Sequence, residues 1–230
     1  MSRCALSKAA RELLLAVWPC ALALLSGAAG GDAASTPLVV VIAVDQLRND
    51  RLTADLPGGL GRIVRQGYRF ENSSLAHGLS NTCPGHAALS TGMHPGKAGV
   101  PGNEYVDRAG WRERYCVEDN DAAHRVIGGS RNRSPELLKV TALGDWLRSS
   151  FPGARVFSVG GKDRSAIMMG GRHPNGVFWF DPDQMRFTSS GYYAGTLPAY
   201  VDAFNSGWEA RLPARWEHPP GTHRPDDFQG

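Results

Sequence analysis

The stretch that indicates the fold reads Leu38-Val39-Val40-Val41-Ile42-Ala43-Val44 and ends at Asp45. It is a continuous run of mostly β-branched side chains without polar alternation, which is typical of a central strand covered on both faces. In open α/β sheets, functional groups gather just beyond the carboxyl ends of such strands. Asp45 is therefore a candidate site residue, and a turn or a helix cap is the alternative role for it.

Helices and strands alternate along the rest of the chain. The patterns predict helices at 59–66, 134–150 and 197–204, and strands at 155–159 and 176–180. The long helix would begin with Ser134 as its N-cap and Pro135 at its first helical position. This order predicts an α/β fold with a mainly parallel sheet flanked by helices.

The amino terminus has the features of a secretory signal. Arg3, Lys8 and Arg11 precede an apolar run at 13–25, and small residues follow at 26–31. A membrane span would need about 20 apolar residues, and this run is shorter and contains a proline. We expect a signal peptide at 1–34 and a periplasmic or secreted protein that meets the membrane only through that signal.

Composition excludes several classes of protein. With 42% hydrophobic and 20% charged residues, the chain can bury enough apolar surface to fold. The 25 basic and 22 acidic side chains give a net charge of +3, so no broad nucleic-acid-binding surface is expected. Common zinc modules are excluded by the lack of Cys-x-x-Cys and His-Glu-x-x-His motifs.

Two cysteines, Cys83 and Cys116, remain after removal of the signal. An oxidising compartment would permit a disulfide between them. Nothing in the sequence brings the two within bridging distance, so buried free thiols are the favoured interpretation.

Residues 77–107 contain the segment with the most chemistry. Asn81 or Thr82, followed by Pro84 and an apolar run, predicts a helix start, which puts the Thr82 hydroxyl near the positive end of a helix. Anions bind readily at such an end. An ordinary capping threonine is the alternative. The glycine and lysine spacing at 92–97 is one residue too short for a P-loop, and no Gly-x-Ser-x-Gly elbow is present.

Several blocks together resemble the alkaline phosphatase superfamily, and they cover residues 38–206. In chain order they are Asp45-Gln46-x-Arg48, Thr82-x-x-Gly85-His86, Thr91-Gly92, Gly102-Asn103, Lys162-Asp163-Arg164 and Gly176-Val177-Phe178-Trp179-Phe180-Asp181. The chain is most similar to the secreted threonine-nucleophile alkaline phosphatases, next to the type I phosphodiesterase and nucleotide pyrophosphatase branch.

The resemblance implies zinc-dependent hydrolysis of phosphate monoesters, with two zinc ions per full-length chain. Asp45 and Thr82 would be metal ligands, and Thr82 would also be the nucleophile that forms a phosphothreonine. Asn103, Lys162 and Arg164 would bind the phosphoryl group. Taken alone, Gly102-Asn103 could equally be a turn, and the two basic residues, on a loop and pointing the same way, could simply be solvated.

Part of the family pattern is missing. The further Asp and His zinc ligands do not appear after Lys162, where the histidines are His173, His218 and His223. We therefore expect the amino-terminal portion of a longer enzyme: an incomplete alkaline phosphatase-like domain at 35–206, and an insertion or truncated tail at 207–230. Alternative functions are a nucleotide phosphodiesterase or pyrophosphatase, or a noncatalytic secreted domain that binds phosphate.

Overall fold

The computed structural model describes residues 37–208 of the 230-residue chain. The expected signal peptide at 1–34 and nearly all of the expected tail at 207–230 lie outside the described residues. Within the described range, no helix has the length and apolar character needed to cross a membrane. The chain divides into two units, Met1–Ala43 and Val44–Gly230.

The described part of the first unit is extended but is not a strand. The side chains of residues 38–42 are between 56% and 86% exposed. The prediction of a central strand at 38–44 is therefore wrong for this structure. A parallel strand is held by hydrogen bonds to its neighbours, and no described strand pairs with this run.

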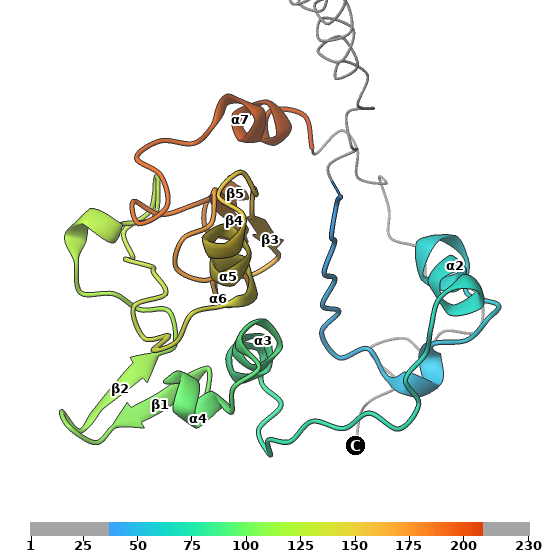
Figure 1. Cartoon of the computed structure of the whole chain (residues 1–230). Helices are drawn as coiled ribbons and strands as arrows, with labels where there is room; N and C mark the ends of the chain where they lie inside the picture. Colours follow the sequence, from blue (N-terminus) through green and yellow to red (C-terminus); the bar gives the residue numbers. More distant parts are fainter. Residues whose placement is uncertain (1–36, 209–230) are drawn as a thin grey trace, which may run out of the picture. The chain divides into compact units, whose positions relative to one another are not determined.

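Among the described residues, all helices and strands lie in the second unit (Figure 1). In chain order these are η1 (Asn49–Arg51), α2 (Gly58–Gln66), α3 (Thr82–Thr91), α4 (Pro95–Ala98), β1 (Glu104–Asp107), β2 (Arg112–Tyr115), η2 (Ala122–His124), α5 (Leu143–Ser150), β3 (Phe157–Gly160), α6 (Asp163–Gly170), β4 (Gly176–Asp181), β5 (Arg186–Thr188) and α7 (Ala199–Asn205). The predicted helices at 59–66 and 197–204 and both predicted strands are found, with ends shifted by one or two residues.

A three-stranded sheet in the order β3-β4-β5 forms the centre of this unit. β3 and β4 are parallel, with Ser158 opposite Val177, and β4 and β5 are antiparallel. α6 connects the parallel pair, and its carbonyl at Ala166 accepts a hydrogen bond from Ser158 Oγ at 2.7 Å. The predicted parallel pairing is thus present, although it involves one pair of strands among the described residues.

The hydrophobic core lies where α6, β4 and α3 meet. Ser90 of α3 donates a hydrogen bond to the carbonyl of Met168 in α6 at 2.7 Å, which joins the two helices. The buried side chains of the core are Cys83, Ala87, Ala98, Val100, Cys116, Val117, Val126, Leu138, Ala166, Ile167, Met168, Val177 and Trp179. By contrast, Phe157 and Val159 on β3 are 51% and 67% exposed, so one face of this strand is uncovered.

The helix predicted at 134–150 begins only at Leu143. Ser134 is fully buried, and its hydroxyl donates to Asp119 while it accepts from the Glu136 amide at 3.1 Å, so it caps a short turn and not a long helix. The backbone of this segment also bonds to distant parts of the chain: Lys139 N donates to Ala98 O at 2.8 Å, and Leu138 O accepts from Arg172 Nη2 at 2.6 Å. These tertiary bonds use groups that a continuous helix would need for its own ladder.

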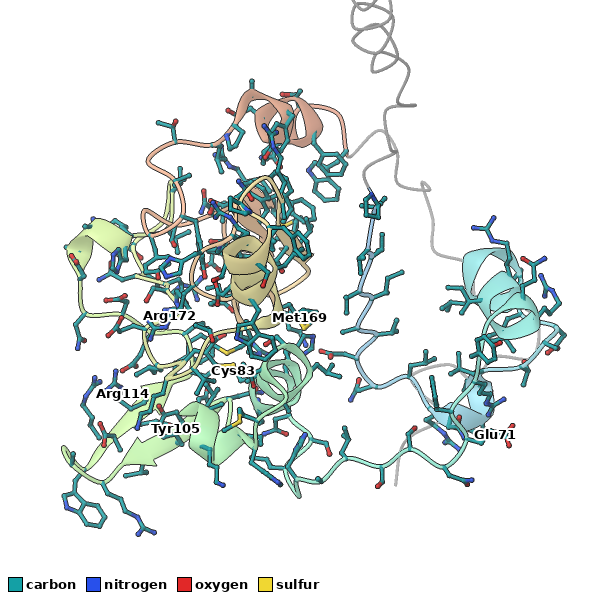
Figure 2. All side chains as sticks on the ribbon, in the orientation of Figure 1. Glu71, Cys83, Tyr105, Arg114, Met169 and Arg172 are labelled. Carbon is teal, nitrogen blue, oxygen red and sulfur yellow. A yellow bond between two sulfur atoms is a disulfide. The ribbon has the colours of Figure 1, made fainter. Side chains whose placement is uncertain are left out.

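An antiparallel hairpin of β1 and β2 follows α4, and Figure 2 labels Tyr105 and Arg114, which face each other across it. Directly after β2, Cys116 forms a disulfide with Cys83 of α3, with Cα atoms 6.5 Å apart. The expectation of two free thiols is therefore wrong. The bridge depends on a spatial approach between residues 33 positions apart, and such an approach leaves no local sequence signal.

Candidate active site

The N-terminus of α3 carries the predicted nucleophile. Asn81 is the N-cap residue and Thr82 is the first helical residue, which confirms the predicted helix start. The helix ends at Gly92, whose φ of 65° lies in the left-handed region that favours glycine. The Thr82 hydroxyl consequently lies in the first turn, where the helix dipole favours negative charge.

Asp45 lies beside this hydroxyl. It occupies a tight turn, followed by Gln46 with a φ of 56°. Thr82 Oγ1 donates to Asp45 Oδ2 at 3.3 Å. His86 Nε2 and Lys162 Nζ lie 3.8 and 3.9 Å from the two carboxylate oxygens. Asp45 is thus a turn residue, as the alternative interpretation of the sequence expected. The same turn also brings its carboxylate to the Thr82 hydroxyl.

Asn103 is attached to the same helix terminus. Its Oδ1 accepts a hydrogen bond from the backbone amide of Cys83 at 2.8 Å, and its backbone carbonyl accepts from Cys116 N at 2.9 Å. Both partners belong to the disulfide, so the two cysteines hold Asn103 from two sides.

Lys162 and Arg164 lie at the start of α6. Lys162 is the N-cap residue with an extended backbone, and Arg164 is the second residue of the helix. The prediction that both lie on a loop and point the same way in an extended chain is therefore wrong, because the helix begins between them. Lys162 contacts Asp45, whereas Arg164 Nη1 donates to the hydroxyl of Tyr115 at 3.1 Å.

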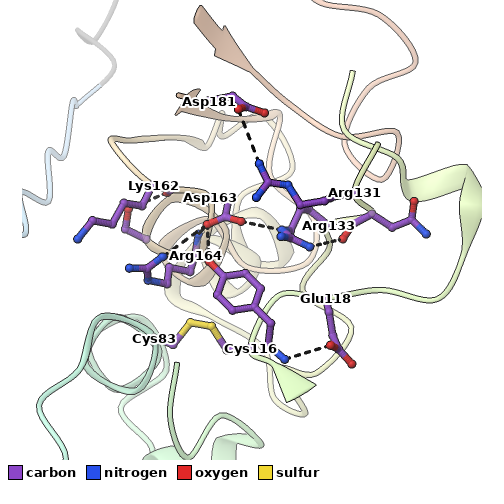
Figure 3. A network of polar contacts seen from close by, with 12 residues as sticks. Cys83, Cys116, Glu118, Arg131, Arg133, Lys162, Asp163, Arg164 and Asp181 are labelled. Carbon is purple, nitrogen blue, oxygen red and sulfur yellow. Dashed lines mark hydrogen bonds and ion pairs between the residues drawn. A yellow bond between two sulfur atoms is a disulfide. The ribbon is translucent and has the colours of Figure 1, made fainter. Parts of the chain in front are cut away.

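A cavity of about 430 Å³ adjoins these residues. Its lining includes Tyr115, Arg133, Lys162, Asp163 and Arg164. Figure 3 labels the last four of these residues. The Nε atom of Arg164 is buried, and no described residue accepts its hydrogen bond. The guanidinium group therefore keeps donor capacity for an anion.

Sequence reasoning missed Tyr115 and Arg133 as parts of this site. In the sequence, Asp163 is only the residue between two basic side chains, yet its carboxylate accepts from Tyr115 OH at 2.6 Å and from Arg133 Nε at 2.7 Å. Tyr115 and Asp163 are separated by 48 positions, so no local pattern links them.

The described residues supply two donors for a metal ion. Oxygen ligands of tetrahedral zinc at about 2.0 to 2.2 Å stand roughly 3.3 to 3.6 Å apart, and the separation of Asp45 Oδ2 and Thr82 Oγ1 fits that range. Zinc takes about four donors. No cluster of three or more His, Cys, Asp or Glu side chains suited to a metal occurs within residues 37–208, so the described residues do not by themselves complete a metal site.

Comparison with known proteins identifies similar chains. Residues 39–223 match the family described as type I phosphodiesterase / nucleotide pyrophosphatase. The chain is 36% identical over 188 residues to alkaline phosphatase PhoV of Synechococcus elongatus, covering 78% of this chain and 33% of that protein. It is 32% identical to alkaline phosphatase PafA of Elizabethkingia meningoseptica, covering 76% and 35%. The chain thus spans about a third of the length of the curated relatives it matches.

Two solved structures of alkaline phosphatase PafA are also similar to this chain. The crystal structure of wild-type PafA aligns with a TM-score of 0.61 and 31% identity, covering 65% of this chain and 29% of PafA. A PafA variant in which a threonine, an asparagine, a lysine and an arginine are replaced aligns with a TM-score of 0.52 at 29% identity. The predicted alkaline phosphatase-like fold is therefore confirmed for the part of the chain that aligns.

Proposed function

This chain belongs to the type I phosphodiesterase / nucleotide pyrophosphatase family, and from that premise we propose that it forms part of a zinc-dependent phosphate-monoester hydrolase. The observation that carries the proposal is the Thr82 hydroxyl in the first turn of α3, within 3.3 Å of the Asp45 carboxylate. Four relatives at 32 to 36% identity bear the name alkaline phosphatase, which supports the same chemistry.

Thr82 acts as the nucleophile. Its Oγ1 forms a bond to phosphorus while the bond from phosphorus to the ester oxygen breaks, which yields a phosphothreonine and the free alcohol. Water then attacks the phosphothreonine and releases inorganic phosphate. Asp45 Oδ2 is the described acceptor for the hydroxyl proton before attack, and the start of α3 favours the negative charge that develops.

Asp45 and Thr82 would hold zinc, with the other donors outside the described residues. When bound, a pair of zinc ions favours the ionised hydroxyl and stabilises negative charge on the entering and leaving oxygens. The described residues perform the remaining tasks of binding and orienting the phosphoryl group.

Asn103, Lys162 and Arg164 bind the phosphoryl oxygens. Arg164 offers a planar set of donors and Lys162 a point charge, and together they suit a dianion. The PafA variant described above has a threonine, an asparagine, a lysine and an arginine replaced. Thr82, Asn103, Lys162 and Arg164 are the same residue types in the same chain order, which supports their assignment.

We also propose that the protein is exported. The charged, apolar and small-residue pattern at 1–34 supports a signal peptide. A buried disulfide between Cys83 and Cys116 supports an oxidising compartment. In this organisation, residues 35–206 form the amino-terminal part of the catalytic domain and 207–230 begin an insertion or tail.

Trapping of the covalent intermediate tests the proposed function. The protein expressed from the whole open reading frame is mixed with para-nitrophenyl phosphate, quenched in acid and digested. We expect the phosphoryl group on the peptide that contains Thr82. Thr82→Ala should abolish both the label and most of the turnover, whereas Thr82→Ser, which keeps a hydroxyl, should retain part of each.

Thr91→Ala is the matched control, because Thr91 lies at the opposite end of the same helix and bonds only to local backbone. It should lower stability without removing the label. Full turnover in Thr82→Ala, or a label on another residue, would contradict the proposal.

The isolated 230-residue chain should bind zinc weakly and turn over little substrate, because two oxygen donors are about half of what zinc requires. Zinc titration by calorimetry checks this expectation. Tight binding of two zinc ions by the isolated chain would show that the ligands had been misjudged.

A further inference from the structure

The hydroxyl of Tyr115 joins two charged groups at the start of α6. It donates to Asp163 Oδ1 at 2.6 Å and accepts from Arg164 Nη1 at 3.1 Å. Burial raises the pKa of Tyr115 to about 12, and the neighbouring Asp163 carboxylate adds to the shift. The phenol therefore stays protonated near neutral pH, where its hydroxyl donates to Asp163 and accepts from Arg164.

Asp163 is itself fixed from two further sides. Its Oδ2 accepts from Arg133 Nε at 2.7 Å, and its Oδ1 also accepts from the backbone amide of Arg164 at 2.7 Å. The Arg133 guanidinium lies over the Tyr115 ring, 4.7 Å from its centre. Figure 3 shows this network beside the disulfide. The side chains of Arg133, Asp163 and Arg164 are only 12%, 17% and 23% exposed, so water competes little for these bonds.

Among residues 37–208, the Tyr115 hydroxyl is the hydrogen-bond partner of the Arg164 guanidinium. Asp163 Oδ1 is 4.0 Å from Arg164 Nη1, which is an ion-pair distance without a hydrogen bond. The hydrogen bond to Tyr115 thus fixes the position of Nη1. The buried Nε–H has no hydrogen-bond acceptor among the described residues.

We propose that Tyr115, held in place by Asp163, is a positioning residue that orients Arg164 toward the phosphoryl group. This inference rests on the proposed function, in which Arg164 binds the substrate. A free arginine loses side-chain entropy when it binds a ligand, and an arginine that is already oriented loses less. Preorganised donors also stabilise the charge of the transition state without rearranging at the moment of reaction.

Tyr115→Phe tests the proposal, because it keeps the ring under Arg133 and removes one oxygen. The measurements are kcat/KM for para-nitrophenyl phosphate and the inhibition constant of inorganic phosphate, in the protein expressed from the whole open reading frame. Because the substitution removes a partner of Arg164 but leaves the cation in place, we expect a loss of about three- to tenfold in kcat/KM, at or below the range for removing Arg164 itself, together with weaker phosphate inhibition. In an Arg164→Ala background, the same substitution should cause no further loss.

Tyr105→Phe is the control, since Tyr105 lies on the same hairpin and its hydroxyl contacts the carbonyl of Gly99 at 3.4 Å. It should leave both constants unchanged. Asp163→Asn provides a second variant, and its loss should also disappear when Arg164 is absent.

The outcomes distinguish a failure of the positioning role from a failure of the proposed function. If Arg164→Ala impairs turnover but Tyr115→Phe does not, or if Tyr115→Phe costs the same with and without Arg164, the positioning role is wrong and the proposed function stands. If Arg164→Ala itself leaves turnover and phosphate inhibition unchanged, the assignment of Arg164 to substrate binding fails, and the positioning role fails with it.

Discussion

The backbone amide of Cys83 donates a hydrogen bond to Oδ1 of Asn103 at 2.8 Å. An amide proton needs an oxygen acceptor, so this contact determines which end of the carboxamide is which. The Asn103 nitrogen is then the end that can donate to a phosphoryl oxygen.

The orientation of Asn103 predicts a difference between two substitutions. Asn103→Asp keeps an oxygen for the Cys83 amide but replaces the donor with a negatively charged acceptor. It should preserve the melting temperature and reduce kcat/KM for an aryl phosphate more than Asn103→Ala does, because the new charge repels the dianion. Steady-state kinetics and thermal unfolding of the two variants check this. An aspartate variant as active as the parent would exclude a donor role for Asn103.

The pair Lys162 and Arg164 predicts a preference for monoesters. A monoester dianion meets both cations, whereas a diester has one negative charge that its second substituent partly covers. Arg164→Ala removes charge-assisted hydrogen bonds worth about 1.5 to 3 kcal/mol, which is roughly a tenfold to hundredfold loss of kcat/KM. The loss on bis-para-nitrophenyl phosphate should be much smaller.

Kinetics with both esters, in the parent, Lys162→Ala and Arg164→Ala, measure this difference. Equal losses on the two esters, or a parent enzyme that prefers the diester, would favour the nucleotide phosphodiesterase alternative.

The disulfide predicts a stability effect. Cys83 and Cys116 are 33 positions apart and both fully buried. Closure of a loop of that length in the unfolded chain corresponds to about 3 to 4 kcal/mol. The double variant Cys83→Ala/Cys116→Ala should lower the free energy of unfolding by an amount of this order, measured by urea denaturation.

Reductant supplies the control for the disulfide. It should destabilise the parent once unfolding exposes the bridge, and it should leave the double variant unchanged. Equal stability of parent and double variant would show that the bridge adds nothing to the folded state.

The lowered pKa of Asp119 leads us to expect a loss of stability in acid. Burial alone would raise the pKa of Asp119, but hydrogen bonds from Ser134, the Asp121 amide and His124 outweigh it and lower the pKa below 3.8. A carboxyl whose pKa is depressed on folding contributes stability above its unfolded pKa and loses it as the pH falls through the folded value. The free energy of unfolding should therefore decline below about pH 4.

Asp119→Asn should be less stable at neutral pH and should show a flatter decline in acid. Asp183→Asn is the control, because the Asp183 side chain is 73% exposed where it pairs with Arg131. Urea unfolding at a series of pH values compares the three proteins. An identical acid decline in parent and Asp119→Asn would assign the effect to other carboxyls.

Local sequence signals were sufficient to predict many of the helix and strand positions in this chain. The helix start at Thr82 follows from a nearby proline and a short apolar run, and the end of α2 from Gly67. The strands β3 and β4 follow from apolar runs bounded by glycine. These features depend on residues within about four positions of one another, which is the range of helical and turn hydrogen bonds.

The predicted elements that the structure lacks depend on more than local sequence. The run at 38–44 has the composition of a strand, but composition is only a tendency, and the structure assigns no strand to these residues. Ser134 does accept from the Glu136 amide as a cap would, but the backbone amide of Lys139 donates to Ala98 O, so no long helix follows. Composition alone therefore predicted tendencies that long-range bonds then altered.

The sequence by itself determined the candidate residues Asp45, Thr82, Asn103, Lys162 and Arg164 and the family to which they point. Only the tertiary structure decided that Cys83 and Cys116 form a bridge and that Tyr115 and Asp163 hold Arg164. The physical reason is sequence separation. A motif consists of residues that are neighbours in the sequence, whereas the orientation of a side chain depends on contacts with residues dozens of positions away.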